Sequence, residues 1–323
     1  MKVFHKLADI PADFGPTFLS VGNFDGVHRA HRHVIDELVR RARAANGRSM
    51  LVTFEPHPVR ILRPDHAFKL LTPTPEKLRL LQATALDAVL LLPFTRDLSL
   101  MTPHQFAHDI LKKHLHAREV HEGYNFHFGN KAAGNIQVLR ELGREMGFEV
   151  HDYPEMRLRG ERVSSTHIRK LLADGRVSRA RHLLGRPFSI LSTPGRGRGY
   201  GAKYTVPTIN LARYEELVPK DGVYITRARI GADEKAECFD AVTNIGNRPT
   251  FGPESFAIET HLLNFHPLEL TADTEVELHF LQRLRGEIKF PSVEALKGQI
   301  GRDVQKAQKY LERIPKSPSS ASR

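Results

Sequence analysis

Short apolar runs alternate with amphipathic segments over the first 185 residues. The apolar residues Phe18, Leu19 and Val21 form the first of these runs. After them, apolar residues recur at helical spacing at Val34, Ile35, Leu38, Val39 and Ala42. The same reading predicts strands at 49–54, 88–93 and 117–121 and helices at 75–84 and 102–115, with another helix beginning near Gly134. Strands that alternate with helices in this way predict a doubly wound α/β fold.

The pattern changes after Gly185, where a short helix within 173–187 is expected to end. Apolar runs then follow one another, separated by Gly, Pro, Asn and Asp, at 188–193, 223–230, 236–244, 257–265 and 275–281. Successive strands without intervening helices predict a small antiparallel β-barrel.

A final helix is expected at 292–313, after the strands. Its apolar stripe consists of Val293, Leu296, Ile300, Val304, Ala307 and Leu311. We therefore expect two domains, at 1–185 and 186–313, the second closed by this helix. The polar segment 314–323 has no periodicity and is expected to be disordered.

Composition narrows the class of protein. A chain of 323 residues can form two domains that each bury a core. It has no run of eighteen apolar residues and its first residues lack a signal-peptide core, so we expect neither membrane insertion nor export. The single cysteine, Cys238, excludes an internal disulfide framework and fits a cytoplasmic location; we expect it to be a passive strand residue.

The formal net charge of +11 allows two interpretations. One is nucleic-acid binding, and the other is a basic surface that binds small anionic ligands. The arginines are dispersed and no nucleic-acid module is recognisable, so we favour small anionic ligands.

The stretch from Val21 to His33 combines an apolar strand, a glycine-containing turn and a helix start. Backbone N–H groups without partners and the positive end of the helix dipole make such a start suitable for phosphate. His28 and His31 lie three residues apart and project on one face, where both could donate hydrogen bonds to a phosphate chain. The alternative is two surface histidines among the eighteen in this chain.

The pattern G-x-F-D-G-x-H-x-x-H resembles the HxGH nucleotidyltransferase signature, specifically the adenylyltransferase half of bacterial bifunctional riboflavin kinase/FAD synthetases. The resemblance implies a Rossmann-like nucleotidyltransferase domain in which ATP contacts Gly22, Asn23, Phe24, Asp25 and Gly26. Ala30 stands between the histidines where the family usually has glycine, which adds a methyl group close to the expected phosphate.

Two loops are expected to contact a flavin. Pro56 and His57 follow the predicted strand 49–54, at the sheet edge where ligands of open parallel sheets bind. Asn125, Phe126 and Phe128 lie between two glycines, in a loop that could pack against a planar ring or simply form a loop core. This segment resembles the family's G-x-D/N-F-x-F-G sequence, which implies the binding role.

Ser164, Ser165 and Thr166 place hydroxyls at a predicted helix start, and Arg169 follows one turn later. Hydroxyls there can bond free N–H groups or a phosphate, and an arginine can reach the same anion. A capped helix with an exposed arginine is the alternative. The string resembles the family's SSTxIR motif, which implies binding of the ATP triphosphate.

Adenylyl transfer requires the 5′-phosphate of FMN to attack the α-phosphorus of ATP and expel pyrophosphate. The protein must align two anions and stabilise the developing charge. The resemblance assigns that task to His28, His31 and Arg169 together with Mg²⁺.

The segment 195–201 is rich in glycine and arginine, and it could be an RNA-binding repeat, a flexible turn or a phosphate loop. Beyond it, Thr208 and Asn210 lie two residues apart on one face of a strand and offer two oxygens to a hard cation such as Mg²⁺. Residues 207–210 resemble the PTxN motif of riboflavin kinases, although the approach to it is rearranged. The resemblance implies ATP contacts at Gly195, Gly197, Gly199 and Lys203.

Residues 244–252 resemble the family's NIGxRPTFG segment, and 259–263 resemble its ExHLL segment. The resemblance makes Glu259 the base that accepts the proton of the ribityl 5′-hydroxyl as that hydroxyl attacks the γ-phosphate. An exposed strand glutamate is the alternative. Residues 284–290 also follow the family pattern, whereas LELTA at 268–272 replaces its Asp-Leu-Tyr-Gly segment.

Together these motifs predict a bifunctional enzyme with ATP, riboflavin, FMN and FAD as substrates and products. The barrel would phosphorylate riboflavin to FMN, and the α/β domain would adenylylate FMN to FAD. Two alternatives stay open at this point: a riboflavin kinase with a weak adenylyltransferase domain, and a flavin- or nucleic-acid-binding regulator without turnover. The oligomeric state does not follow from the motifs.

Overall fold

The computed structural model describes residues 1–195, 208–232, 235–247 and 256–314. The chain forms two compact units, Met1–Ser165 and Thr166–Arg323. The second unit therefore begins with the helices that precede Gly185. Within the described ranges, every helix is too short or too polar to cross a membrane.

The first unit is built on a six-stranded parallel sheet with the order β1-β4-β3-β2-β5-β8. Its strands are β1 (Lys2–Phe4), β2 (Thr17–Val21), β3 (Arg48–Glu55), β4 (Ala88–Pro93), β5 (Ala117–Gly123) and β8 (Glu149–Tyr153). Two small hairpins pair β6 (His127–Phe128) with β7 (Gly134–Asn135) and β9 (Arg157–Leu158) with β10 (Glu161–Arg162). The predicted doubly wound α/β fold is confirmed.

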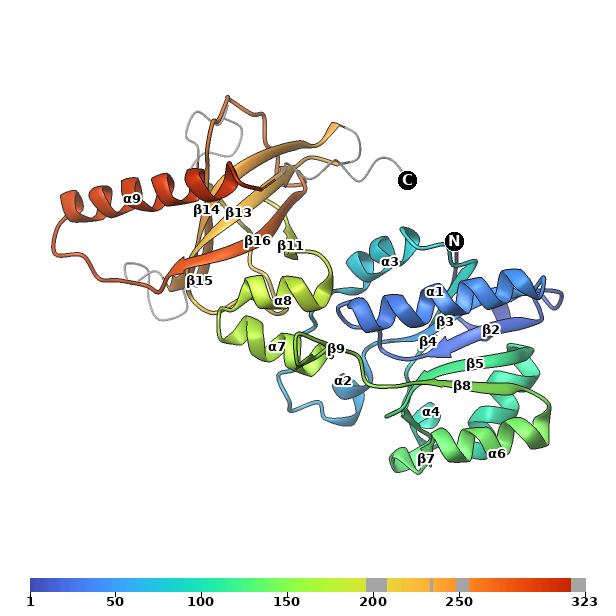
Figure 1. Cartoon of the computed structure of the whole chain (residues 1–323). Helices are drawn as coiled ribbons and strands as arrows, with labels where there is room; N and C mark the ends of the chain where they lie inside the picture. The colour runs from blue at the N-terminus through green and yellow to red at the C-terminus, as the bar shows by residue number, and fades with distance from the viewer. Residues whose placement is uncertain (196–207, 233–234, 248–255, 315–323) are drawn as a thin grey trace. The chain divides into compact units, whose positions relative to one another are not determined.

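Helices cover both faces of this sheet, with α1 on one face and α6 on the other (Figure 1). The α-helices are α1 (Arg29–Ala44), α2 (Pro58–Leu62), α3 (Thr74–Gln82), α4 (Arg96–Leu100), α5 (Pro103–Gln105) and α6 (Ile136–Met146). Short 3-10 turns η1 (Leu7–Asp9) and η3 (Asn130–Ala132) complete the connections. Because helices lie on both faces, the central strands are apolar on both sides.

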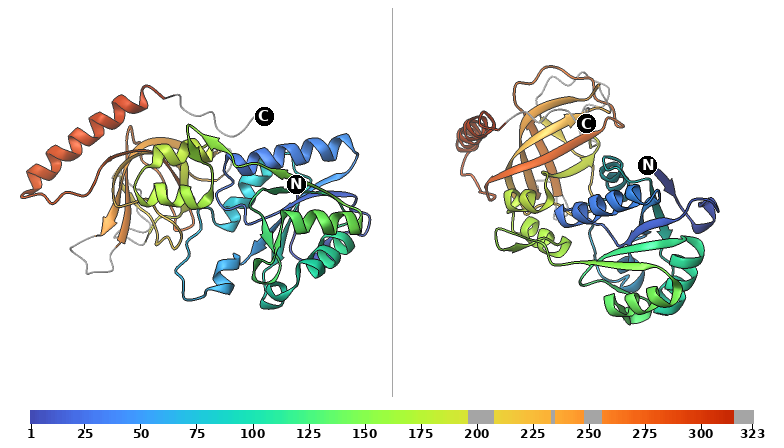
Figure 2. Two further views of the ribbon diagram at one scale, coloured as in Figure 1. Left: turned by 60° about the horizontal axis from the view of Figure 1, so that its bottom comes forward. Right: turned by 45° about the vertical axis from the view of Figure 1, so that its right-hand side comes forward.

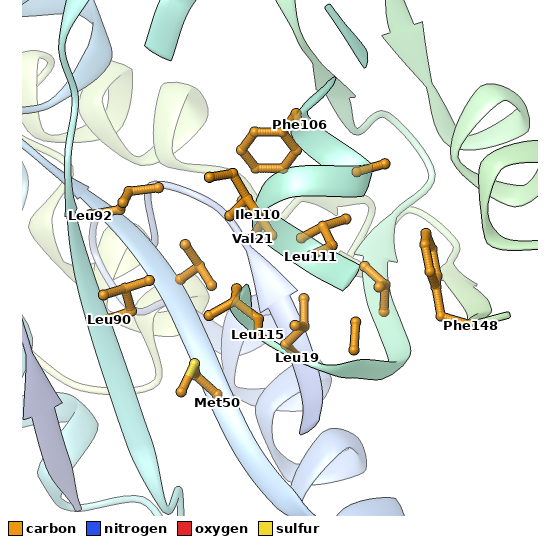
Figure 3. Close-up of a cluster of buried hydrophobic side chains, with 14 of the residues drawn as sticks. Leu19, Val21, Met50, Leu90, Leu92, Phe106, Ile110, Leu111, Leu115 and Phe148 are labelled. Carbon is orange, nitrogen blue, oxygen red and sulfur yellow. The ribbon is translucent and has the colours of Figure 1, made fainter. Parts of the chain in front are cut away.

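Two apolar clusters hold the layers together. On the α1 side, Ile35 and Leu38 pack with Phe18 and Leu51. On the other side, side chains from Phe106 to Leu115 meet the sheet, and Figure 3 shows this cluster with Leu19, Val21, Met50, Phe106, Ile110, Leu111 and Leu115 labelled. Both faces of β2 are thereby buried, which fixes the strand that leads into the histidine turn.

The helix expected at 102–115 begins as predicted but changes type. Thr102 and Gln105 form a capping box, and Pro103 occupies the first turn. From Phe106 to His114 the segment η2 is a π-helix, and Leu115 N donates to the carbonyl of Ile110, five residues earlier. Phe106, Ile110 and Leu111 on this segment are nevertheless buried.

The second unit is a curled antiparallel sheet with the order β11-β16-β13-β14-β15-β12, drawn from two further sides in Figure 2. Its strands are β11 (Phe188–Ser192), β12 (Thr208–Asn210), β13 (Gly222–Ile230), β14 (Glu237–Asn247), β15 (Phe256–Leu262) and β16 (Val276–Arg285). An isolated bridge between Pro194 and Leu211 joins the ends of the two outermost strands. The predicted barrel is confirmed in this curled form.

Helices α7 (Ser165–Ala173) and α8 (Val177–Leu184) precede the barrel strands. As predicted, α8 ends at Gly185, which adopts a left-handed conformation with φ of 81°. Helix α9 (Val293–Leu311) follows the last strand, and the side chain of Ser292 caps it.

The predicted closing helix is present as α9, and its apolar stripe is only partly buried on the barrel. Ala307 and Leu311 are buried against Ile225 and Leu281. Three stripe residues in the first turns are exposed: Val293 by 60%, Leu296 by 39% and Ile300 by 44%. Figure 1 shows these first turns extending past the strands. Periodicity identifies the residues that share a face, whereas the length of strand beneath the helix decides how many are covered.

Candidate active sites

The first site is built on the turn between β2 and α1. Gly22 N still bonds to the carbonyl of Val52 on β3, after which Phe24, Gly26 and Val27 take positive φ values of 46°, 89° and 38°. Such a conformation is strained for Phe24 and Val27 and must be held by its surroundings. The turn is therefore pre-shaped by the fold.

His28 is the N-cap of α1 and is only 4% exposed. Its Nδ1 accepts a hydrogen bond from the backbone N–H of His31 at 3.3 Å. Because Nδ1 is the acceptor, the neutral ring carries its proton on Nε2. His28 is therefore prepared to donate a hydrogen bond from Nε2.

The rings of His28 and His31 stack with centroids 3.6 Å apart and planes at 16°, and the edge of Phe24 lies 5.1 Å from His31. The two histidines thus share one face, as predicted. Nδ1 of His31 is buried and has no hydrogen-bond partner among the described residues. Burial, followed by the nearby charges of His28 and Lys77, lowers the pKa of His31 well below its usual value. His31 is therefore neutral at pH 7, and it can offer a phosphate a hydrogen bond but not a positive charge.

Asp25 supports the turn from within the protein. Its two carboxylate oxygens accept hydrogen bonds from the backbone N–H groups of Leu71 and Thr72, both at 3.0 Å. The side chain is 3% exposed. These contacts connect the turn to the segment that precedes α3, so Asp25 has a structural role whether or not it also contacts ATP.

Lys77 is a site residue that the sequence analysis missed. It is 4% exposed, and its Nζ donates to the carbonyl of Asn23 at 3.2 Å and to Oγ1 of Thr53 at 3.0 Å. Burial lowers the pKa of Lys77, while the charges of Asp25 and Glu55 oppose that shift. The sequence did contain a signal for this role, because Lys77 falls on the inward face of the amphipathic helix predicted at 75–84.

The start of α7 reaches this turn across 140 residues of sequence. Oγ of Ser165 donates to the carbonyl of Asp25 at 2.8 Å. Two predicted ATP-binding stretches, at 22–26 and 164–165, therefore meet in the first unit. Thr166 and Arg169 belong to the part of α7 assigned to the second unit, and their contact with ATP stays a prediction.

The sheet order places a switch point between β2 and β5, because the chain leaves β2 toward β3 on one side while β5 lies on the other. The ladder between these strands ends at Leu19 and Val120. Beyond it, Oε1 of Glu122 accepts the Val21 N–H at 2.6 Å. A side chain thus replaces the backbone partner at the point where the strands separate.

Glu122 is 3% exposed, and burial raises its pKa well above the usual value, although the bond from Val21 acts in the opposite direction. We therefore expect this carboxyl group to remain protonated far above pH 4.5. Sequence analysis missed Glu122 because its role depends on the neighbouring strand.

The expected flavin loops lie at the carboxyl ends of β3 and β5. Pro56 directly follows β3. His57 caps α2 through a bond from Val59 N to Nδ1 at 3.3 Å, and its ring stacks on Phe68 at 4.4 Å. Both ends belong to the same edge of the parallel sheet as the histidine turn.

In the second loop, Phe126 and Phe128 stack with centroids 5.4 Å apart, and Asn125 is exposed. Phe128 is 8% exposed and packs so closely on Gly134 that a Cβ there would lie 2.6 Å from its ring. Phe128 therefore anchors the loop, whereas Asn125 and Phe126 are the more accessible of the three predicted residues.

The second site lies on β12 and β15. Thr208 pairs with His261 and Asn210 pairs with Glu259, while the intervening Ile209 is 1% exposed. Because side chains alternate across a strand, these four polar residues share the face opposite Ile209. Oγ1 of Thr208 lies 3.1 Å from Nδ1 of His261. The predicted metal residues and the predicted base are therefore neighbours.

Other groups surround this second site. Asn244 of β14 pairs with Glu259 from the opposite side. Burial lowers the pKa of His261, which keeps its ring neutral at pH 7. Gly195 N donates to the carbonyl of Asn210 at 2.7 Å. Gly197, Gly199, Lys203 and residues 248–252 of the NIGxRPTFG resemblance lie outside the described residues.

Family models match both halves of the chain: FAD synthetase at residues 10–167 and riboflavin kinase at residues 184–311. The bifunctional riboflavin kinase/FMN adenylyltransferase of Escherichia coli (strain K12) is 34% identical over 311 residues, or 96% of this chain and 97% of that protein. The chain belongs to the bifunctional riboflavin kinase/FMN adenylyltransferase family. The family prediction is confirmed, and these matches favour neither alternative.

A second member of the bifunctional riboflavin kinase/FMN adenylyltransferase family, from Buchnera aphidicola subsp. Schizaphis graminum, is 31% identical over 317 residues, covering 97% of this chain and all of the relative. Among solved structures, a chain titled a macrolide-efflux protein from Streptococcus pneumoniae has a TM-score of 0.82 and 25% identity, and the match covers 96% of this chain and 98% of that one. The fold of this family member thus has a crystallographic counterpart.

Proposed function

We propose that this chain makes FAD from riboflavin in two ATP-dependent steps, at two separate sites in the cytoplasm. The barrel would phosphorylate riboflavin to FMN, and the parallel sheet would transfer AMP from a second ATP to FMN. The observation that carries the proposal is that each half holds its own group of reactive side chains, the stacked pair His28 and His31 and the cross-strand pair Asn210 and Glu259. We place the working boundary near Gly185, with catalytic domains at 1–185 and 186–313.

In the adenylyl transfer, an oxygen of the FMN 5′-phosphate attacks the α-phosphorus of ATP, and the bond to pyrophosphate breaks. His28 would donate from Nε2 to the phosphate chain, since its Nδ1 is already engaged by His31 N. His31 and the N-terminus of α1 would add donors, and Arg169 would add a fixed charge. Donors of this kind act on charge that develops in the transition state, and each contributes about 10²- to 10³-fold in rate.

In the kinase step, Glu259 would accept the proton of the ribityl 5′-hydroxyl as its oxygen forms a bond to the γ-phosphorus and ADP leaves. The oxygens of Thr208 and Asn210 fit a Mg²⁺ ion, because this cation prefers a small number of hard oxygen ligands completed by phosphate and water. Bound Mg²⁺ would neutralise phosphate charge. His261, bonded to Thr208, would orient that hydroxyl.

The proposal is tested by incubating the purified full chain with riboflavin, excess ATP and Mg²⁺ and following the flavins by chromatography. We expect FMN to rise first and then to give way to FAD. Accumulation of FMN without FAD would show that the chain acts only as a riboflavin kinase. Ala30 would then be the first residue to test for its effect on the adenylyl transfer. The absence of any flavin product would overturn both steps.

A further inference from the structure

A tripeptide repeats on β5 and β8, the last two strands at one side of the parallel sheet. Glu-Val-His occurs at 119–121 on β5 and again at 149–151 on β8. The strands pair in register, with Glu119 opposite Glu149 and His121 opposite His151. Since side chains alternate along a strand, both glutamates and both histidines lie on one face of the sheet, and we call these four residues the double Glu-Val-His cluster.

The distances within this cluster match those between ligands of a tetrahedral metal ion. Oε2 of Glu119 lies 3.0 Å from Nε2 of His121 and 3.3 Å from Nε2 of His151. All three atoms lie within 4.8 Å of one another. Two ligands bound to Zn²⁺ at ~2.0–2.1 Å and at the tetrahedral angle are roughly 3.3 Å apart. Oε2 of Glu149 lies 3.4 Å from Nε2 of His151 and 3.9 Å from a terminal nitrogen of Arg41, and Glu149 is not part of the three-residue group.

Burial and hydrogen bonding also favour an ion over a simple polar network. His121 is fully buried and Glu119 is 7% exposed. Nε2 of His151 is a buried atom that makes no hydrogen bond within the described residues, even though two carboxylates lie near it. A buried ring nitrogen directed at carboxylates without a hydrogen bond is better satisfied by a metal ion than by the present contacts.

The groups around the cluster orient its ligands. Nδ1 of His121 lies 2.7 Å from the hydroxyl of Tyr153, which leaves Nε2 directed into the cluster. Arg41 of α1 donates from Nε and an NH2 group to the two oxygens of Glu119 and holds that carboxylate in place. Such outer contacts are typical of metal-ligating histidines and carboxylates.

We propose that Glu119, His121 and His151 bind a transition-metal ion of the Zn²⁺ class, with water in the fourth position. The chemistry is that of two imidazoles and a carboxylate on a cation, a set that suits Zn²⁺ better than Mg²⁺. The ion would fasten the edge strand β8 to β5. Since the carbonyl of Tyr153 accepts the N–H of Tyr124, the same strand also supports the loop that carries Asn125 and Phe126.

The test uses the full chain, stripped of metal with a chelator and titrated with Co²⁺, whose visible absorption reports tetrahedral coordination, and then with Zn²⁺ in competition. We expect one saturable equivalent and at least a tenfold loss of affinity in His151→Gln. His104→Gln is the matched control, because His104 also lies 3.4 Å from a carboxylate, that of Glu145, but on the surface. This control should bind like the unmodified chain.

Melting temperatures give a second readout that is independent of colour. Zn²⁺ should raise the melting temperature of the unmodified chain and of His104→Gln, but not that of His151→Gln, because a ligand stabilises only the state that binds it. Wild-type affinity in His151→Gln would overturn the proposal. So would loss of binding in His31→Ala with retention in His151→Gln, since the ion would then lie at the histidine turn.

Discussion

Asn210 lies directly opposite Glu259 in the antiparallel pair of β12 and β15. An amide oxygen suited to Mg²⁺ and a carboxylate suited to proton transfer therefore share one face of the barrel, although 48 residues separate them in the chain. This pairing makes the second site testable one residue at a time.

Glu259→Gln should abolish FMN formation from riboflavin while leaving the conversion of supplied FMN to FAD intact. The amide keeps the shape of the side chain but removes the proton acceptor. Chromatographic assays with each substrate check this result, and Glu269→Gln, at an exposed position, serves as the control. Loss of both activities in a folded Glu259→Gln protein would contradict the two-site arrangement.

His31→Ala should reduce FAD formation by about 10²- to 10³-fold, because one donor to the phosphate chain is lost. Riboflavin phosphorylation should be unchanged. His33→Ala is a close control, since His33 lies two residues further along and is exposed. Unaltered FAD synthesis by purified His31→Ala would remove His31 from the catalytic group.

Lys77→Met should impair FAD formation by at least about tenfold while sparing the kinase, since the turn loses the bonds from Nζ to Asn23 and Thr53. The exposed Lys113→Met provides a control for the loss of a positive charge. Steady-state kinetics with FMN and ATP would show the effect. Equal rates in the two variants would mean that the turn keeps its shape without Lys77.

Glu122→Gln should flatten the dependence of stability on pH. Burial raises the pKa of Glu122 in the folded protein, so its contribution to stability is fully present below about pH 4.5 and is lost progressively as the pH rises toward the folded pKa. Glutamine resembles the protonated acid and does not ionise. Urea unfolding from pH 5 to pH 8 measures the difference in free energy of unfolding between the unmodified chain and Glu122→Gln. This difference should shift in favour of Glu122→Gln as the pH rises. A difference that stays constant would argue that Glu122 is already ionised.

The two halves of α9 should respond differently to the same substitution. Leu311→Ala should lower the free energy of unfolding of the barrel by about 2–4 kcal/mol, because Leu311 is buried against Ile225. Leu296→Ala should change it by no more than about 0.5 kcal/mol, because Leu296 is 39% exposed. Thermal or urea denaturation of both variants makes the comparison. Equal losses would mean that the first turns of α9 are covered in solution.

Local patterns in the sequence were enough to predict much of this protein. The spacing of Ile35, Leu38 and Ala42 predicted α1, and the two-residue spacing of Thr208 and Asn210 predicted their shared face, because helical and extended backbones repeat every 3.6 and 2 residues. The order of the motifs predicted the family. These features depend on residues close together in the chain.

Tertiary structure decided the relationships between residues that are distant in the chain. Glu122 reaches Val21 only because β5 lies beside β2, and His151 meets Glu119 only because β8 adds to the same edge. Lys77 was missed because a buried ammonium group is identified by its partners rather than by its neighbours in sequence. The periodicity of α9 identified its apolar stripe but not how much of that stripe is buried, because the spacing of residues does not encode how far a helix extends beyond the sheet it packs on. Sequence by itself determined which side chains share a face, and packing of the strands and helices decided which faces meet.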